Sequence, residues 1–435
     1  MPAAVPVCLV FLLSACDLGA VALGDDDVDQ RLLSESPAAL HLVDALEGGG
    51  ELTFAQLFER GEGLTFANRP DPSALLTATN VLDDARDRAG RVPLTLLTLN
   101  IGLLDLKVLG FIPYARTPDL DQRRQVVAGR IFSRADDVVL LQELWLEPDI
   151  EEFVRTGEDF GYRGFFPHDR STHVDGLAIF VKESVISGGT TPSVRGGTYA
   201  SQDTKEYFPG PGIQRSWMSL RFIHPDVGPV TLFDTHLQSF PEHWLGRMKQ
   251  GRELGIIMRQ VLDDEETADD LILLGGDLNA APYYTKATWT IPDGSVQDRW
   301  FHNTLLQPVL ASYADLVDLA IMGRPARDAL ADVALGDTVV NDATTALDIP
   351  GASPDWCATT PTTTFTNTDC NSLSFEQYAG TEYPARVDHL LAHDPNGRIV
   401  VAKSELVFTK PEPFGGVVVE TSDHYGVAAE IFVSR

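Results

Sequence analysis

The sequence LILLGGDLNAAP, residues 271–282, gives the clearest structural signal in the chain. Its aliphatic run is bounded by glycines, which predicts a short buried strand. Asp277 and Asn279 come two residues apart just past this strand, so on extended backbone both side chains point to the same side. A carboxylate that binds a cation or accepts a proton, beside an uncharged amide, suits a phosphate ester with a metal ion. The alternative is an ordinary Asp/Asn turn.

The chain is long and strongly acidic. Its 435 residues could hold two or three average domains, although a large α/β sandwich can fill such a length as one unit. Lys and Arg number 33 against 63 Asp and Glu, which gives a net charge of -30. Because non-specific nucleic-acid affinity comes mainly from Lys and Arg, this charge disfavours long DNA as a partner.

The N-terminus, residues 1–16, is predicted to be a signal peptide. Residues 5–13 are apolar but too few to span a membrane, and the motif LSAC at 13–16 resembles a bacterial lipobox. Cys16 would then carry a lipid anchor, so we expect an exported bacterial protein that is either a membrane-anchored lipoprotein or secreted. The absence of Lys and Arg before the apolar run departs from the usual pattern. A non-lipidated signal peptide and a buried N-terminal strand are the alternatives.

Two cysteines remain once Cys8 leaves with the signal peptide and Cys16 is lipidated. These are Cys357 and Cys370, which flank a Thr-rich segment. In an exported protein they are expected to form a disulfide that closes this loop. Two free buried thiols are the alternative.

Beyond the signal, residues 17–90 form an acidic, weakly patterned N-terminal extension, with helices predicted near 37–47 and 74–89. Strand patterns then recur, with helices at 120–134 and 243–262. Many strands with few helices between them favour two packed sheets with helices outside over strict βαβ alternation. The predicted strands are 94–99, 138–141, 176–181, 217–222, 230–235, 271–274, 386–392, 399–406 and 427–432.

Polar residues recur at the ends of these strands. Each alone could be a helix cap, a turn residue or a buried histidine, but six such places in one chain are hard to attribute to chance. They are Asn100, Gln142-Glu143, His236, Asp277 with Asn279, Asp388, and Asp423-His424.

The motifs at these places, taken in order, resemble those of the endonuclease/exonuclease/phosphatase superfamily, which includes deoxyribonuclease I and the neutral sphingomyelinases. The resemblance covers residues 91–435, the expected catalytic domain. It implies an α/β fold: a four-layered α/β sandwich with two packed mixed β-sheets flanked by helices. The motifs are TLN at 98–100, LQE at 141–143, THL at 235–237, GDLN at 276–279, RVD at 386–388 and SDH at 422–424.

The resemblance also implies a divalent metal ion. Glu143 would be its main ligand, with Asn100 close by and Asp423 as a second ligand or a support. Carboxylate and amide oxygens favour Mg²⁺, with Mn²⁺ or Ca²⁺ as alternatives. Such an ion polarises phosphoryl oxygens and stabilises the charge on a leaving oxygen.

Two histidines would supply the acid–base chemistry. By the resemblance, His424 paired with Asp388 activates water or holds the scissile phosphate, and Asp277 is the rival for positioning the water. His236 would protonate the leaving oxygen or bind phosphate, with Asp175 as a candidate partner. Which histidine is the acid stays open.

Substrate binding would fall to Asn279, which the resemblance places on a non-bridging phosphate oxygen, together with Asn100 and Asp175. THLQ at 235–238 and Leu278 lean toward the sphingomyelinase-like branch, although no counterpart of its exposed aromatic hairpin is evident. We therefore expect an exported Mg²⁺-dependent phosphodiesterase acting on a phospholipid headgroup, a sphingomyelinase-like phospholipase C. The alternatives are an extracellular deoxyribonuclease-like endonuclease and a catalytically inactive binding protein of the same fold.

Overall fold

The computed structural model describes most of the region with strand patterns. The described residues are 90–108, 112–167, 175–201, 214–239, 244–279, 289–290, 296–297, 327–328, 387–393 and 398–435. The expected signal peptide with Cys16, nearly all of the N-terminal extension, and the pair Cys357 and Cys370 lie outside them.

The first large sheet has six strands in the order β15-β18-β1-β4-β6-β5. β1 pairs with β4 in parallel, and the other neighbours are antiparallel, so the sheet is mixed. Its strands are β1 (Arg91–Asn100), β4 (Val138–Gln142), β5 (Tyr162–Phe165), β6 (Ala178–Lys182), β15 (Ile399–Val407) and β18 (Gly426–Ser434).

The second large sheet repeats this plan in the order β13-β14-β10-β9-β8-β7. β9 and β10 form its parallel pair, and the rest is antiparallel. Its strands are β7 (Ser193–Thr198), β8 (Ser216–His224), β9 (Gly228–His236), β10 (Leu271–Asp277), β13 (Arg327–Asp328) and β14 (Asp388–His393).

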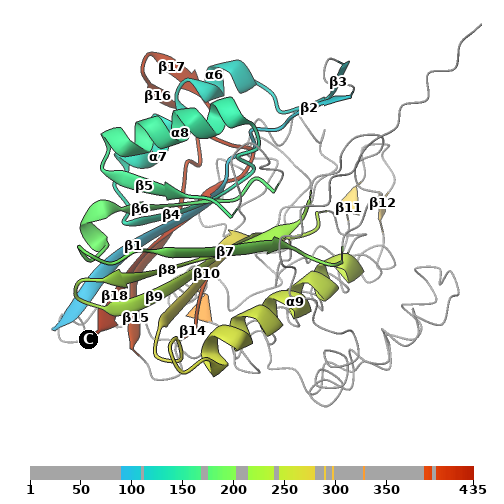
Figure 1. Cartoon of the computed structure of the whole chain (residues 1–435). Coiled ribbons are helices and arrows are strands. Elements are labelled where there is room, and N and C mark those ends of the chain that lie inside the picture. The colour runs from blue at the N-terminus through green and yellow to red at the C-terminus, as the bar shows by residue number, and fades with distance from the viewer. Residues whose placement is uncertain are drawn as a thin grey trace, which may run out of the picture. The chain divides into compact units, whose positions relative to one another are not determined.

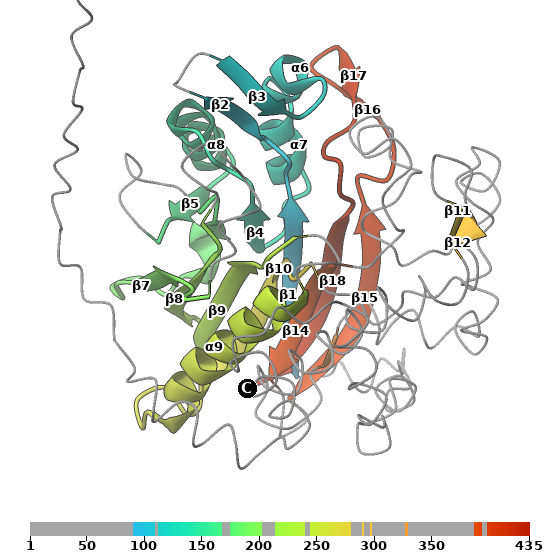
Figure 2. The same ribbon diagram turned by 90° about the vertical axis from the view of Figure 1, so that its right-hand side faces the viewer.

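Helices cover the outer faces of the two sheets (Figure 1). On the first sheet, Phe132 and Phe153 of the helices pack on Phe180 of β6, with ring centroids 5.0 and 6.3 Å apart. On the second, Leu254 and Met258 belong to one buried cluster with strand residues, and Figure 2 shows their helix lying along β9. The four layers therefore match the predicted sandwich. The helices are α6 (Leu120–Arg124), α7 (Val127–Ser133), α8 (Glu147–Asp159) and α9 (Trp244–Asp263).

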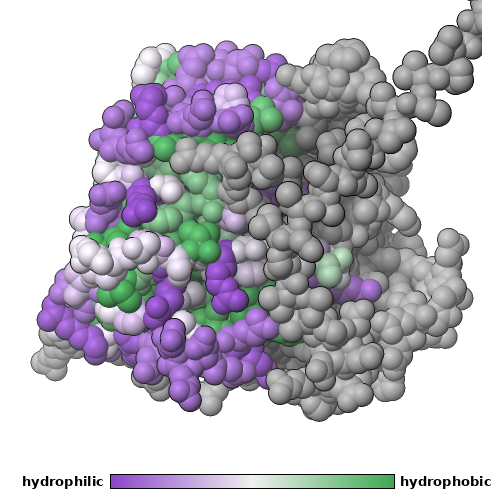
Figure 3. Space-filling view, viewed as in Figure 1, coloured by the Kyte–Doolittle hydropathy of each residue, from purple (hydrophilic) through white to green (hydrophobic). Residues whose placement is uncertain are grey.

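The surface agrees with this layering. In Figure 3, hydrophilic residues cover the region of α8 and that of α9, and hydrophobic residues are visible between them. Among the described residues, no helix is long and apolar enough to cross a membrane.

Between the sheets, alternate strand residues form the main core. Leu96, Leu140, Leu232 and Leu273 all belong to one buried cluster there. Because side chains alternate along a strand, the inward positions continue as Asn100, Gln142, Asp234, His236 and Asp277 toward the strand ends. The space between the sheets is thus apolar at one end and polar at the other.

The region predicted as one helix at 120–134 is two helices, α6 and α7. The chain leaves helical geometry at Val126, whose φ is -129°. Shorter elements complete the description: β2 (Asp105–Val108), β3 (Ile112–Arg116), η3 (Glu183–Val185), β11 (Trp289–Thr290), β12 (Val296–Gln297), β16 (Glu412–Phe414) and β17 (Val417–Val419).

Candidate active site

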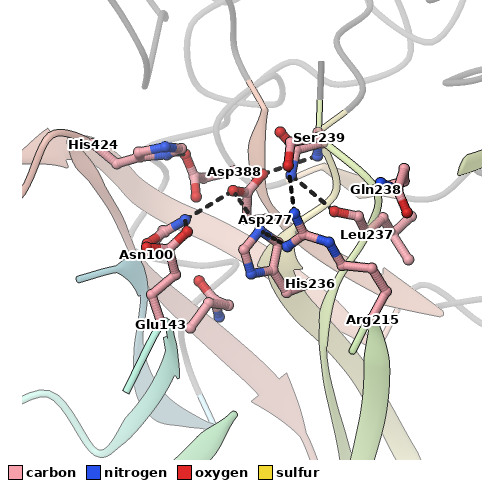
Figure 4. A network of polar contacts seen from close by, with 12 residues as sticks. Asn100, Glu143, Arg215, His236, Leu237, Gln238, Ser239, Asp277, Asp388 and His424 are labelled. Atoms are coloured by element: carbon pink, nitrogen blue, oxygen red, sulfur yellow. Dashed lines mark hydrogen bonds and ion pairs between the residues drawn. The ribbon is translucent and has the colours of Figure 1, made fainter. Parts of the chain in front are cut away.

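Strand register places the polar strand ends in two rows. In the first sheet Asn100 lies beside Gln142, directly before Glu143. In the second sheet Asp277 lies between His236 and Asp388. We call Asn100, Glu143 and Asp423 the carboxylate half of the site, and His236, Asp277 and Asp388 the histidine half. The close view in Figure 4 shows Asn100 and Glu143 facing the three residues of the histidine half.

Asn100 joins the two halves. Its side-chain amide donates to Glu143 Oε1 at 3.2 Å and to Asp277 Oδ2 at 3.0 Å (Figure 4). Its Oδ1 accepts the backbone N–H of Gly102 at 3.0 Å. The amide therefore serves first to hold two carboxylates from different sheets in place.

Glu143 is the half-buried carboxylate at the end of β4. Its φ of +64° is a left-handed backbone conformation that costs energy for a residue with a side chain. Burial and the negative charge of Asp423 raise the pKa of Glu143 to about 7. Two nearby carboxylates that repel each other would be stabilised by a cation between them.

Asp423 is held in the loop before β18. Ser422 Oγ donates to the backbone O of Asn100 at 2.5 Å and lies 3.1 Å from Asp423 Oδ1. The loop after β1 comes so close that a Cβ on Gly102, where φ is +55°, would lie 2.1 Å from Asp423 Oδ1. Only glycine fits this approach.

His424 links the sheets a second time. Its Nδ1 lies 2.8 Å from Asp388 Oδ2, and both side chains are buried. Burial alone would lower the pKa of His424, but Asp388, Asp277 and Asp423 together raise that pKa well above 6.5. These carboxylates therefore favour the protonated, cationic form of the ring.

Asp277 sits at the centre of the histidine half. It is almost completely buried, and burial together with the charge of Asp388 raises its pKa to about 6. It is mainly ionised at neutral pH, which suits a group that accepts a proton from water. Its Oδ2 lies 3.4 Å from His236 Nε2.

Arg215 is a site residue that the sequence patterns did not reveal. It is buried, its Nη1 lies 2.6 Å from His236 Nε2, and its Nη2 donates to Ser239 Oγ. Burial, followed by the positive charges of Arg215 and His424, lowers the pKa of His236 well below 6.5. A neutral ring that accepts from Arg215 at Nε2 carries its proton on Nδ1, which has no hydrogen-bond partner in the described part of the chain.

Two further predicted residues lie differently from expectation. Asp175 is buried and its Oδ1 accepts the N–H of Leu177 at 3.3 Å, whereas the hydrogen bond of His236 within the described chain is to Arg215. Asn279 is not on extended backbone, because its φ is +48° and its N–H donates to Asp277 Oδ1 at 2.9 Å. The Asp/Asn turn is therefore real. Asn279 Nδ2 also donates to Leu237 O at 2.9 Å.

The donor set fits a divalent cation. The carboxylate half offers Glu143 and Asp423, whose mutual repulsion a cation would relieve. Within the described chain, ligand atoms of Asp277, Asp388 and His424 also lie within 4.8 Å of one another.

The fold is a four-layered sandwich of two facing mixed sheets with helices outside. Carboxylates, amides and histidines gather at the strand ends of both sheets. This combination defines a hydrolase of phosphate esters. The chain belongs to the Endonuclease/Exonuclease/phosphatase family, whose sequence profile matches residues 97–424. Enzymes of this family cleave phosphodiesters and generally depend on divalent metal ions. The expected family and fold are confirmed. No curated protein sequence matches the chain.

Three solved structures resembling the chain share 14% to 17% identity with it. Truncated TDP2 of Caenorhabditis elegans has 17% identity and a TM-score of 0.47, over 80% of this chain and 99% of that one. The human Nocturnin catalytic domain with bound sulfate anion has 14% identity and a TM-score of 0.44, over 82% of this chain and 100% of that one. Beta toxin from Staphylococcus aureus has 16% identity and a TM-score of 0.46, over 77% of this chain and 99% of that one.

Proposed function

We propose that this protein is an exported, Mg²⁺-dependent phosphodiesterase that hydrolyses a phospholipid headgroup ester, as a sphingomyelinase-like phospholipase C does. The observation that carries the proposal is the convergence of Asn100, Glu143, His236, Asp277, Asp388 and His424 at facing strand ends. Its net charge of -30 favours a lipid headgroup over a nucleic acid, because a polyphosphate chain is repelled by such a protein.

Glu143 and Asp423 would hold the metal ion, and the amide of Asn100 would fix Glu143 beside it. The bound ion would polarise the phosphoryl oxygens and stabilise charge on the leaving oxygen. Mn²⁺ and Ca²⁺ satisfy the same oxygen ligands and are the alternatives to Mg²⁺.

Asp277 would position the attacking water and accept its proton. The water oxygen bonds to phosphorus, the bond to the leaving oxygen breaks, and the proton is finally returned to the leaving alcohol. His424, a cation fixed by Asp388, would hold the scissile phosphate rather than act as the base. The sequence alone did not decide whether His424 or Asp277 activates the water. In this proposal Asp277 activates the water and His424 holds the phosphate.

His236 would bind phosphate as a neutral hydrogen-bond donor. Among the residues that the structure describes, its Nδ1–H has no hydrogen-bond partner, and Arg215 on the other ring nitrogen fixes this tautomer. The second N–H of the Asn279 amide would bind a non-bridging oxygen, because the first donates to Leu237 O. The buried Asp175 lies before β6 and would support this side of the phosphate site.

A substrate panel tests the function. Purified protein is incubated with sphingomyelin, phosphatidylcholine, plasmid DNA and bis-p-nitrophenyl phosphate, in Mg²⁺ or in EDTA. We expect lipid and chromogenic hydrolysis only with Mg²⁺, and none in Glu143→Gln, while the exposed control Glu151→Gln stays fully active. Cleavage of DNA without cleavage of lipid would replace the phospholipase by the nuclease.

The same proposal includes export through residues 1–16 and lipid attachment at Cys16. The support is the lipobox-like motif at residues 13–16. Expression in a bacterium fed labelled palmitate should give a labelled protein in the membrane fraction, and Cys16→Ala should lose the label. Unlabelled protein retained in the cytoplasm would contradict this part.

A further inference from the structure

A buried arginine lies under the carboxylate half of the site. Arg123, in the short helix α6, has no exposed surface. All three of its guanidinium nitrogens donate to backbone carbonyls. Nε and Nη2 bond Thr421 O at 3.2 and 3.0 Å, Nη1 bonds Gly102 O at 2.8 Å, and Nη2 also bonds Ile101 O.

These carbonyls belong to the two loops that carry metal-ligand candidates. Ile101 and Gly102 directly follow Asn100, and Thr421 comes two residues before Asp423. The loops touch each other through Ser422 Oγ, which donates to the backbone O of Asn100. A single planar guanidinium thus fixes both loops from one side.

A cation in this place is costly unless something offsets it. Within the described chain, Arg123 forms no ion pair at contact distance, and removal of an arginine charge from water carries a large free-energy penalty. Burial lowers the pKa of Arg123, whereas the charges of Asp423 and Glu143 act in the opposite direction. Among the charges that act on Arg123, those of these two site carboxylates are the largest, ahead of Asp119 and Glu420.

We infer that Arg123 is a positioning residue for the cation site: its hydrogen bonds to the loops after β1 and before β18 set the spacing of Asn100 and Asp423 around Glu143. Arg123 touches neither substrate nor metal and acts through the backbone. The inference rests on the proposed metal-dependent function. It explains why a charged residue, rather than an apolar one, fills the space between α6 and these loops.

Three substitutions test the inference. Arg123→Lys keeps the charge but cannot span both loops, and Arg123→Met removes the donors at similar length. The matched control is Arg247→Met, because Arg247 is also buried and donates to a backbone carbonyl, Gln238 O at 2.8 Å, beside the histidine half. Mn²⁺ binding is titrated directly by electron paramagnetic resonance, and thermal unfolding is followed in EDTA.

We expect Mn²⁺ affinity to fall about 10- to 100-fold in both Arg123 variants, as for other residues that orient metal ligands, and to stay unchanged in Arg247→Met. Activity of Arg123→Lys should recover when Mg²⁺ is raised by the same factor. If Arg123→Met does not fold, Arg123→Lys decides alone. Variants that bind Mn²⁺ like the wild type, although destabilised, would overturn the inference. A wild-type protein that binds no Mn²⁺ would overturn the metal-dependent function itself.

Discussion

The carboxylate half and the histidine half are built on the same plan but with opposite electrostatics. Each uses the ends of a parallel strand pair, β1 with β4 and β9 with β10. In the first, neighbouring negative charge contributes to the raised pKa of Glu143; in the second, neighbouring positive charge contributes to the lowered pKa of His236. A divalent cation would relieve the first half and a phosphate anion the second. On the proposed function, this difference favours the metal ion beside Glu143 and the phosphate beside His236, while the carboxylates Asp277 and Asp388 repel each other within the histidine half.

The largest effect is expected from His424→Ala, because this ring belongs to a loop of the first sheet and is bonded to Asp388 of the second. Its loss removes a positioned cation from the phosphate, and we expect kcat to fall about 10²- to 10⁴-fold. Hydrolysis of bis-p-nitrophenyl phosphate measures this. Asp388→Asn should lose less, because the ring stays in place. Activity near that of the wild type in His424→Ala would show that the halves work without this link.

Next comes Arg215→Met, which removes positive charge from the histidine half. We expect activity to fall about 10²- to 10³-fold, as when one donor to a developing oxyanion is lost. The pKa of His236 should rise, because one of the two cations that lower it is gone. A pH titration of the His236 ring by nuclear magnetic resonance gives the direction. An unchanged or lower pKa would contradict the assigned role of Arg215.

A third effect concerns the polar contacts between the two sheets at Thr98, Gln142 and Asp234, which we call the seam. Asp234 and Gln142 are fully buried, and Gln142 Nε2 donates to Asp234 Oδ1 at 2.7 Å, while Asp234 Oδ2 and Gln142 Oε1 have no partner within the described chain. Burial raises the pKa of Asp234 well above 3.8.

A raised pKa in the folded state stabilises the protein below the unfolded pKa, and this stability is lost as pH rises toward the folded pKa. Asp234→Asn does not titrate, so its stability relative to the wild type should increase as pH rises above ~4 until the folded pKa of Asp234 is reached, by up to about 1.4 kcal/mol per pH unit for one proton. Urea unfolding between pH 4 and 7 measures the difference. The exposed control Asp226→Asn should show no such trend, and a flat difference for Asp234→Asn would argue that Asp234 is ionised when folded.

The smallest effect should come from Thr98→Val in the same seam. Thr98 Oγ1 accepts from Gln142 Nε2 at 3.3 Å, a long contact, and valine has nearly the same shape. We expect a loss of about 1 kcal/mol in the free energy of unfolding, with kcat unchanged. A loss of several kcal/mol would mean that the seam, and not the apolar core, fixes the sheets against each other.

The strands and their polar ends were predictable because both follow from period-two alternation. Leu94, Leu96 and Asn100 all lie at inward positions of β1. The same alternation therefore predicts both the apolar core residues and the polar site residue at the strand end. The division of helix 120–134 and the turn at Asn279 depend on local backbone conformation that residue types only weakly determine.

Arg123 and Arg215 were not predicted from the sequence, for two different reasons. Arg123 binds backbone carbonyls from residues far along the chain, which leaves no motif in the sequence. Arg215 precedes Ser216, whose antiparallel partner is His236, so the pairing of β8 with β9 was the signal that could have found it. The pairing of His236 with Asp175 was expected from the family resemblance, whereas strand register brings Asp277 beside His236.

One measurement tests the shared centre most directly: hydrolysis of bis-p-nitrophenyl phosphate as a function of Mg²⁺ in the wild type and in Glu143→Gln and His424→Ala. The wild type should lose activity in EDTA and regain it with saturable Mg²⁺ dependence. Glu143→Gln should regain none at the same Mg²⁺, whereas His424→Ala should keep the Mg²⁺ dependence at a much lower kcat. Activity that survives EDTA, or that persists undiminished in both variants, would contradict a metal-dependent centre built from two halves.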